Sequence, residues 1–173
     1  MRAFQDKLTG HAEEASRATG IPAKFMLGQA ALESGWGRRE IKGADGTNSN
    51  NLFGIKAGGQ WSGASVNAGT QEYENGSAIS TTGQFRAYDS RAQSFQDYVS
   101  LLRNSPRYAA ALNTGSNVHA FAAALQRGGY ATDPDYASKI SSIAGSINPQ
   151  PATQEPSLKS ASARPINPTT GIL

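Results

Sequence analysis

AALESGWG, residues 30–37, places a glutamate inside an apolar segment and closes that segment with two glycines around a tryptophan. Apolar residues at helical spacing run from Pro22 to this point, so the pattern predicts a helix with Glu33 in its last turn. The carbonyl end of the helix dipole and partly apolar surroundings both disfavour a negative charge there, which raises the pKa of the Glu33 carboxyl group. A carboxylic acid that keeps its proton near neutral pH can protonate a leaving oxygen.

An alternative interpretation makes Glu33 a surface acid that pairs with Arg38 or Arg39. A second acid facing Glu33 would favour the chemical role. Glu72 and Glu74 alternate along a predicted strand, QEYEN, and therefore point to the same face. Paired carboxylates across a cleft are the usual groups that cleave a glycosidic bond, so both acids are candidates for the partner.

The rest of the chain predicts a helical body with a small β insertion. Four further helices are expected: one from Phe4 to before Gly20, two behind caps at Ser90 and Asn117, and one starting at Asp133–Pro134. Residues 43–88 are rich in glycine instead. Their short apolar segments, at residues 52–55 and 85–88, predict short strands, and Asn75-Gly76 predicts a hairpin turn. We therefore expect an α+β fold with a cleft between the two parts.

Composition divides the chain and excludes several classes of protein. Residues 149–173 are rich in proline, serine and threonine and predict an extended tail, which leaves one domain over residues 1–148. The absence of cysteine excludes disulfides and thiolate metal sites, and no apolar run is long enough for a membrane span. The net charge of +3 is scattered, which is atypical of nucleic-acid binding. His11 and His119 have no acidic cluster nearby, so we expect no metal and no cofactor.

Five blocks occur in an order that carries a family resemblance: AALESGWG, NNLFGIKA, YENG, FRAYDSRAQSFQDYVSLL and GGYATDPDYASKI. Together they resemble the peptidoglycan-hydrolase modules of flagellar FlgJ proteins, which belong to family seventy-three of the glycoside hydrolases, β-N-acetylglucosaminidases. The resemblance covers about residues 3–148. It implies a lysozyme-like fold, with a helical lobe facing a β lobe.

The resemblance also implies roles for particular residues. Glu33 corresponds to the general acid, and Glu72 to the second carboxylate, with Glu74 as the alternative. Tyr130 corresponds to a tyrosine beside the catalytic glutamate, although a tyrosine packed over a helix end is the other interpretation.

By the same resemblance, three more residues correspond to residues of the cleft wall in the family. They are Asn51, Phe53 and Trp61, and an aromatic face among them is suited to stacking on a sugar ring. For Phe53, packing in the core is an equally good interpretation.

The implied activity is hydrolysis of the β-1,4 bond between N-acetylglucosamine and N-acetylmuramic acid, which opens the cell wall for flagellar rod assembly. Inverting, retaining and substrate-assisted mechanisms all stay open. The alternatives are a lytic transglycosylase and a non-catalytic wall-binding or rod-assembly module. The resemblance implies a periplasmic location reached through the flagellar export apparatus, peptidoglycan as the partner, and rod proteins as further partners through an N-terminal region absent from this sequence.

Overall fold

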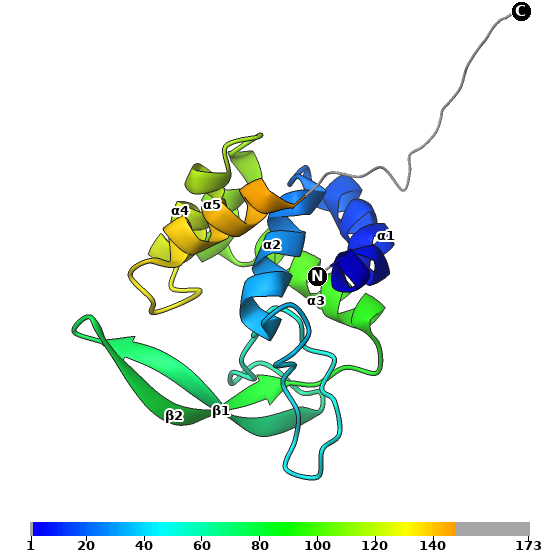
Figure 1. The fold of residues 1–173 in the computed structure, drawn as a ribbon, viewed down its shortest axis with the longest axis vertical. Coiled ribbons are helices and arrows are strands. Elements are labelled where there is room, and N and C mark those ends of the chain that lie inside the picture. The colour runs from blue at the N-terminus through cyan, green and yellow to red at the C-terminus, as the bar shows by residue number, and fades with distance from the viewer. Residues whose placement is uncertain (1, 148–173) are drawn as a thin grey trace, which may run out of the picture.

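The α-helices of the larger lobe lie where the sequence predicts helices. The computed structural model describes residues 2–147 and divides them into a helical lobe and a β lobe (Figure 1). The helical lobe contains α1 (Arg2–Thr19), α2 (Ala23–Ser34), α3 (Arg91–Asn104), the 3₁₀ helix η1 (Pro106–Asn113), α4 (Val118–Arg127) and α5 (Tyr136–Ser146). The expected tail, residues 149–173, lies outside the described residues.

The central helix of this lobe is α2, which is buried on nearly every side. It packs against α1 and against α5. Gly28 allows α5 to approach closely, because a Cβ at this position would lie 3.3 Å from the backbone nitrogen of Ala144. A helix that is apolar all round is typical of such a position. Its last turn carries Glu33 out of the core to the boundary between the lobes.

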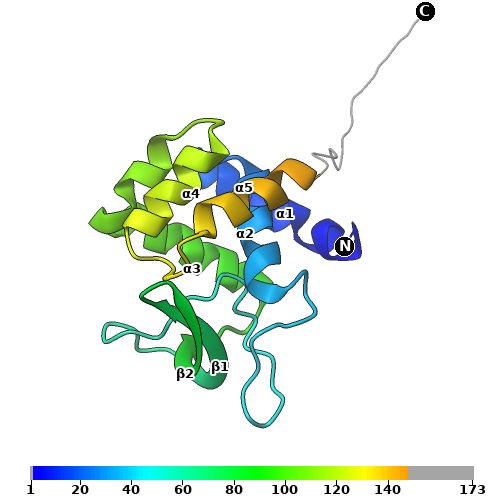
Figure 2. The same cartoon turned by 60° about the vertical axis from the view of Figure 1, so that its left-hand side comes forward.

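The β lobe is built on one antiparallel hairpin, β1 (Ser65–Glu74) and β2 (Ser77–Arg86). Asn75 and Gly76 form its turn with φ angles of 52° and 81°, the left-handed backbone of a type I′ turn, which confirms the prediction. In both ribbon views the helices gather on one side and the hairpin lies on the other (Figure 1, Figure 2). The expected α+β arrangement, a helical lobe facing a small β lobe, is therefore the observed one.

Local capping signals mostly place the helix starts correctly. The side chain of Ser90 accepts a hydrogen bond from the backbone N–H of Gln93 at 3.2 Å, and Asn117 accepts one from Ala120 at 2.9 Å. The predicted start of the last helix is wrong, because α5 begins at Tyr136. The carboxylate of Asp133 instead accepts from the N–H of Asp135 at 2.8 Å, which forms a turn before the helix.

The strand expected at residues 52–55 is a loop in the structure. The side chain of Asn51 accepts hydrogen bonds from the backbone N–H groups of Phe53 and Ile55, at 3.3 and 3.2 Å. These bonds curl the loop and satisfy donors that a sheet would otherwise need. The helix η1 was not expected from the sequence at all. Within residues 2–147, no helix is long and apolar enough to cross a membrane.

Candidate active site

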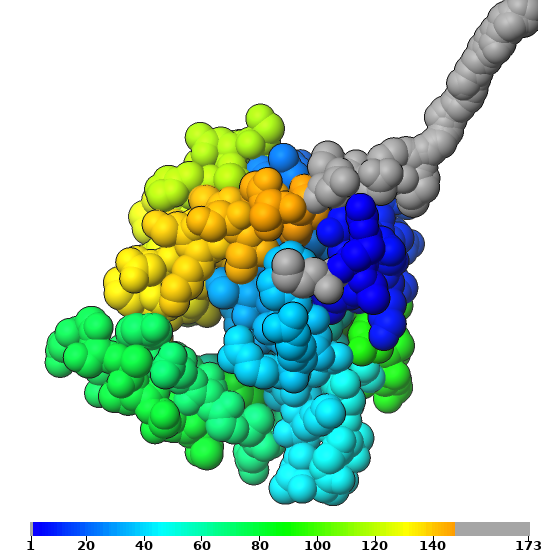
Figure 3. All heavy atoms as spheres, in the orientation of Figure 1, coloured from blue at the N-terminus to red at the C-terminus, as the bar shows by residue number. Residues whose placement is uncertain are grey.

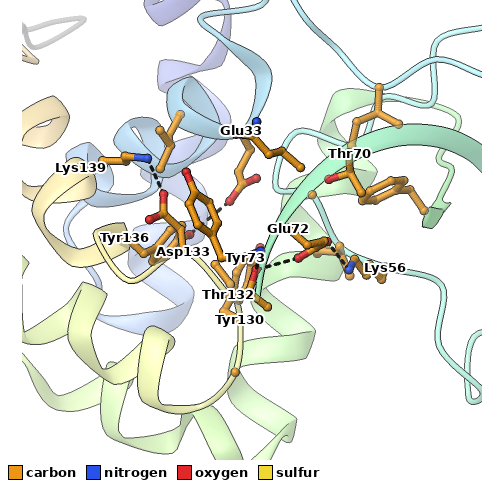
Figure 4. Close-up of a pocket in the computed structure, with 18 of the residues that line it drawn as sticks. Glu33, Lys56, Thr70, Glu72, Tyr73, Tyr130, Thr132, Asp133, Tyr136 and Lys139 are labelled. Atoms are coloured by element: carbon orange, nitrogen blue, oxygen red, sulfur yellow. Dashed lines mark hydrogen bonds and ion pairs between the residues drawn. The ribbon is translucent and has the colours of Figure 1, made fainter. Parts of the chain in front are cut away.

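A cleft of about 630 Å³ separates the two lobes. The space-filling view shows the opening between the hairpin and the helices (Figure 3). Glu33 of α2 lines one side, Glu72 of β1 lines the other, and the loop of residues 129–133 borders both. Figure 4 shows how these side chains converge from elements far apart in the sequence.

The end of α2 holds Glu33 in a fixed position. Gly35 adopts the left-handed conformation, with φ of 59°, and its N–H donates to the carbonyl of Ala31. The hydroxyl of Ser34 donates to the carbonyl of Ala30 at 2.7 Å and accepts from the N–H of Gly37 at 3.0 Å. These contacts end the helix tightly, so the backbone under Glu33 is well defined.

Gly54 supplies the opposite wall of the pocket around the Glu33 carboxyl group. Its φ is 65°, and a Cβ on Gly54 would lie 2.8 Å from Oε1 of Glu33. No residue with a side chain fits there without displacing the acid. The loop of residues 51–55 therefore encloses the carboxyl group from the β side.

Burial of Glu33 changes its acidity. Removal from water raises the pKa of the carboxyl group from 4.5 to about 7; a hydrogen bond from Tyr136 lowers it in part, and the charge of Glu72 adds to the rise. None of the ion pairs found among residues 2–147 involves Glu33. The alternative of a surface acid paired with Arg38 or Arg39 is therefore not the arrangement observed.

The pKa of Glu72 is shifted in the opposite direction to that of Glu33. Its partial burial would raise the pKa, but hydrogen bonds from Lys56 and Thr132 and the charge of Lys56 outweigh this effect, so the pKa is lowered overall. Lys56 Nζ lies 2.5 Å from Oε2, and the Thr132 hydroxyl donates to Oε1 at 2.9 Å. Glu74 is exposed and does not line the cleft. Of the two hairpin acids, the structure brings only Glu72 into the cleft with Glu33.

Tyr130 lies in the cleft wall between the two lobes. Its hydroxyl donates to the carbonyl oxygen of Phe53 at 2.6 Å, and its ring stacks on that of Tyr136 with centroids 6.2 Å apart. Burial raises the pKa of the Tyr130 hydroxyl well above its ordinary value, so the group stays a neutral donor. The hydrogen bond ties the loop before α5 to the loop that carries Gly54.

Asn51 and Phe53 do not line the cleft, which corrects the expectation for both side chains. The ring of Phe53 is fully buried and stacks on Tyr98 with centroids 4.0 Å apart. Asn51 is also buried, and its amide group donates to the carbonyls of Ile55 and Arg86, both at 2.8 Å. These two side chains shape the loop under Gly54 and are not available to touch a sugar.

Trp61 also lies outside the residues that line the cleft. The guanidinium group of Arg86 covers its ring at 4.7 Å, and Tyr88 packs against it edge to face at 5.8 Å. Its indole N–H donates to the carbonyl of Ala64 at 2.8 Å. The ring therefore closes the base of the hairpin, and the expected sugar platform is not supported by its position.

Three residues at the site were not singled out from the sequence. Lys56 and Thr132 hold Glu72, and the hydroxyl of Tyr136 donates to Oε2 of Glu33 at 3.4 Å. Tyr136 fits the apolar spacing of α5, which predicts only a core residue. The signal that it carries a second role is its place in the block GGYATDPDYASKI beside Tyr130. Over residues 2–147 no cluster of three or more potential metal ligands occurs.

Comparisons with known proteins identify the relatives of this chain. A family model described as mannosyl-glycoprotein endo-beta-N-acetylglucosaminidase, the glucosaminidase family, matches residues 9–149. The peptidoglycan hydrolase FlgJ of Pseudomonas aeruginosa is 50% identical over 133 residues, which cover 77% of this chain and 33% of that protein. The exo-glucosaminidase LytG of Bacillus subtilis is 38% identical over 145 residues, covering 81% of this chain and 49% of that protein. The chain thus spans a third to a half of the length of these relatives.

Solved structures show the same fold. A peptidoglycan hydrolase mutant from Sphingomonas sp. A1 is 52% identical and superimposes with a TM-score of 0.77, covering 83% of this chain and 92% of that one. A truncated glycoside hydrolase domain of Salmonella typhimurium FlgJ is 45% identical, with a TM-score of 0.65, and covers 83% of this chain and 94% of that one. By its matching family model, its identity to these proteins and its fold, the chain belongs to the glucosaminidase family.

Proposed function

We propose that this chain hydrolyses the β-1,4 bond between N-acetylglucosamine and N-acetylmuramic acid in peptidoglycan. The observation that carries the proposal is the pairing, in one cleft, of an acid protonated up to about pH 7 with a carboxylate whose pKa is lowered. Two titratable groups with pKa values pushed apart are suited to the two roles of glycoside hydrolysis. The family description and the exo-glucosaminidase relative support cleavage at N-acetylglucosamine, and the name of the FlgJ relative supports peptidoglycan as the substrate.

In this proposal, Glu33 donates its proton to the bridging oxygen as an oxocarbenium-like centre develops on the sugar. Glu72 either activates the attacking water or stabilises the positive charge. Tyr130 lines the same cleft and fixes the loop of Gly54 against the acid. If the acetamido group of the substrate attacks instead, loss of Glu72 reduces the rate much less than loss of Glu33.

Basic side chains support an anionic polymer as the substrate. The residues that line the cleft include Arg39, Lys56, Arg86, Arg107 and Lys139. Peptidoglycan carries peptide carboxylates, which a positive cleft attracts from a distance. We expect weaker binding to peptidoglycan as the salt concentration rises, because exposed charges are screened.

The test compares release of soluble fragments from purified peptidoglycan by the wild type, Glu33→Gln and Glu14→Gln. Glu14 is an exposed acid on α1, so this variant controls for loss of one negative charge. We expect Glu33→Gln to lose activity while it still binds insoluble peptidoglycan, and Glu14→Gln to keep activity. Equal release by the wild type and Glu33→Gln would overturn the role of Glu33. Binding without release by the wild type itself would favour a non-catalytic module.

Mass spectrometry of the fragments separates hydrolysis from the transglycosylase alternative. Hydrolysis adds one water across the broken bond, whereas a lytic transglycosylase leaves an anhydro ring. We expect reducing ends with N-acetylglucosamine and no anhydro product. Detection of an anhydro end would mean that the reaction is transglycosylation, with Glu33 still as the acid, and not hydrolysis.

We further propose that the activity serves assembly of the flagellar rod in the periplasm, with the protein exported through the flagellar apparatus and in contact with rod proteins. The identity to FlgJ proteins of several bacteria supports this setting. In a strain that lacks the gene, we expect the wild-type gene to restore motility and the Glu33→Gln allele to fail. Full restoration by that allele would separate motility from wall cleavage.

A further inference from the structure

A chain of buried hydrogen bonds leads from the core of the helical lobe to the carboxyl group of Glu33. The hydroxyl of Tyr98, on α3, donates to Oε1 of Gln29 on α2. The Gln29 amide donates from Nε2 to the hydroxyl oxygen of Tyr136 at 2.8 Å, and Tyr136, on α5, donates to Oε2 of Glu33 at 3.4 Å. Tyr98 and Gln29 have no exposed surface, and Tyr136 is 2% exposed. Figure 4 shows the last contact, in which Tyr136 faces Glu33.

The direction of these bonds is set by the number of hydrogens. A phenol has a single O–H, and Gln29 is the one acceptor found for that of Tyr98 within residues 2–147. The amide oxygen of Gln29 is therefore turned to Tyr98, and its NH₂ group is turned to Tyr136. Since the oxygen of Tyr136 accepts from this NH₂, its own hydrogen remains for Glu33. The flipped amide would leave the buried hydroxyl of Tyr98 without an acceptor, which is unfavourable.

We propose that this relay of Tyr98, Gln29 and Tyr136 keeps the acidic proton of Glu33 on Oε1, the oxygen next to Gly54 in the lining of the cleft. This inference rests on the proposed function and deepens it. A neutral carboxyl group has one hydroxyl oxygen and one carbonyl-like oxygen, and a donor at Oε2 favours the carbonyl-like form there. Oε1 lies so close to Gly54 that a Cβ would approach it to 2.8 Å. The three residues are positioning residues, because they act through Glu33.

The hydrogen bond from Tyr136 also keeps the pKa of Glu33 below the value that burial alone would give. Burial raises the pKa of the carboxyl group, and the hydrogen bond from Tyr136 partly opposes the rise, because it also stabilises the ionised form. The other titratable groups toward Glu33 are Glu72 from the hairpin, Tyr130 from the loop before α5, and Tyr98 through Gln29. Removal of the Tyr136 hydroxyl therefore raises the pKa of Glu33 further.

The experiment measures the Glu33 carboxyl pKa by ¹³C NMR titration, and kcat/KM on peptidoglycan fragments against pH, in Tyr136→Phe, Tyr98→Phe and the wild type. We expect Tyr136→Phe to raise the Glu33 pKa and the basic limb of the profile by about 0.4 to 1 pH unit, and to lower the best kcat/KM about tenfold. We expect Tyr98→Phe to raise the Glu33 pKa and the basic limb by a smaller amount, although the Tyr98 hydroxyl does not touch Glu33. Tyr88→Phe, which removes a hydrogen bond to Asp97 outside the cleft, controls for loss of a buried tyrosine hydroxyl and leaves both values unchanged.

Folded variants of Tyr136 and Tyr98 with an unchanged Glu33 pKa and basic limb would overturn the relay, even if their rates fall. A neutron diffraction structure of the wild type at pH 6 tests the assignment without any substitution. Deuterium on Oε1 supports the proposal, and deuterium on Oε2 overturns it. Absence of fragment release by the wild type would instead count against the proposed function, and the titration and the neutron structure would still decide the relay.

Discussion

The raised pKa of Glu33 predicts that the acid destabilises the folded protein above neutral pH and that Glu33→Gln removes this penalty. The folded pKa lies near 7 and the unfolded value near 4.5. Below the unfolded value both states hold the proton. Between the two values only the folded state holds it, so stability falls as pH rises and stays lowered above the folded pKa. A glutamine at this position keeps the shape of the side chain without titrating.

The size of the effect follows from the two pKa values. One pKa unit corresponds to about 1.4 kcal/mol. The rise in the pKa of Glu33 therefore lowers the folding stability of the wild type by about 3 kcal/mol between pH 4 and pH 8. The free energy of unfolding of Glu33→Gln minus that of the wild type is therefore expected to be about 2 to 3 kcal/mol larger at pH 8 than at pH 4. Because each comparison is made at one pH, contributions from the other acids cancel.

Urea denaturation followed by far-ultraviolet circular dichroism, at both pH values, measures this difference. Glu14→Gln serves as the control for the loss of a negative charge on an exposed helix face. A stability difference that is the same at pH 4 and pH 8 would refute the reasoning. It would mean that Glu33 ionises as an ordinary solvated glutamate and cannot retain its proton for catalysis.

Three more predictions concern the cleft and its supporting loop. The pH profile of kcat/KM should fall above about pH 7 as Glu33 loses its proton, and its acidic limb should lie below 4.5, where Glu72 is protonated; a basic limb far from 7 would contradict the assignment. Lys56→Met should raise the pKa of Glu72 and move the acidic limb upward while the basic limb stays in place, because Lys56 donates to Glu72 and not to Glu33; a profile identical to that of the wild type would show that Glu72 does not set that limb. Asn51→Ala should lower the free energy of unfolding by about 2 to 4 kcal/mol and reduce kcat more than KM, since it removes four hydrogen bonds of a buried side chain from the loop that carries Gly54; wild-type stability in the same urea assay would show that the loop holds its shape without them.

The sequence predicts best what depends on residues close together in the chain. The caps at Ser90 and Asn117 act over three residues, and the Asn75-Gly76 turn is set by its own two residues. The fold class follows from such signals, because helical periodicity and a glycine-rich hairpin region leave few ways to bury the apolar faces. The start of α5 was missed because Asp133 uses its carboxylate in a turn that precedes the helix.

By itself, the sequence determined a helix whose last turn carries Glu33 and a separate hairpin that carries Glu72 and Glu74. Only the tertiary structure decided which partners this acid has. Glu72 enters the cleft and Glu74 does not, Phe53 turns into the core, and Tyr136 reaches Glu33 from 103 residues along the chain. The physical reason is that periodicity and capping are short-range properties, whereas the environment of a carboxyl group depends on how separate helices and a hairpin pack around it.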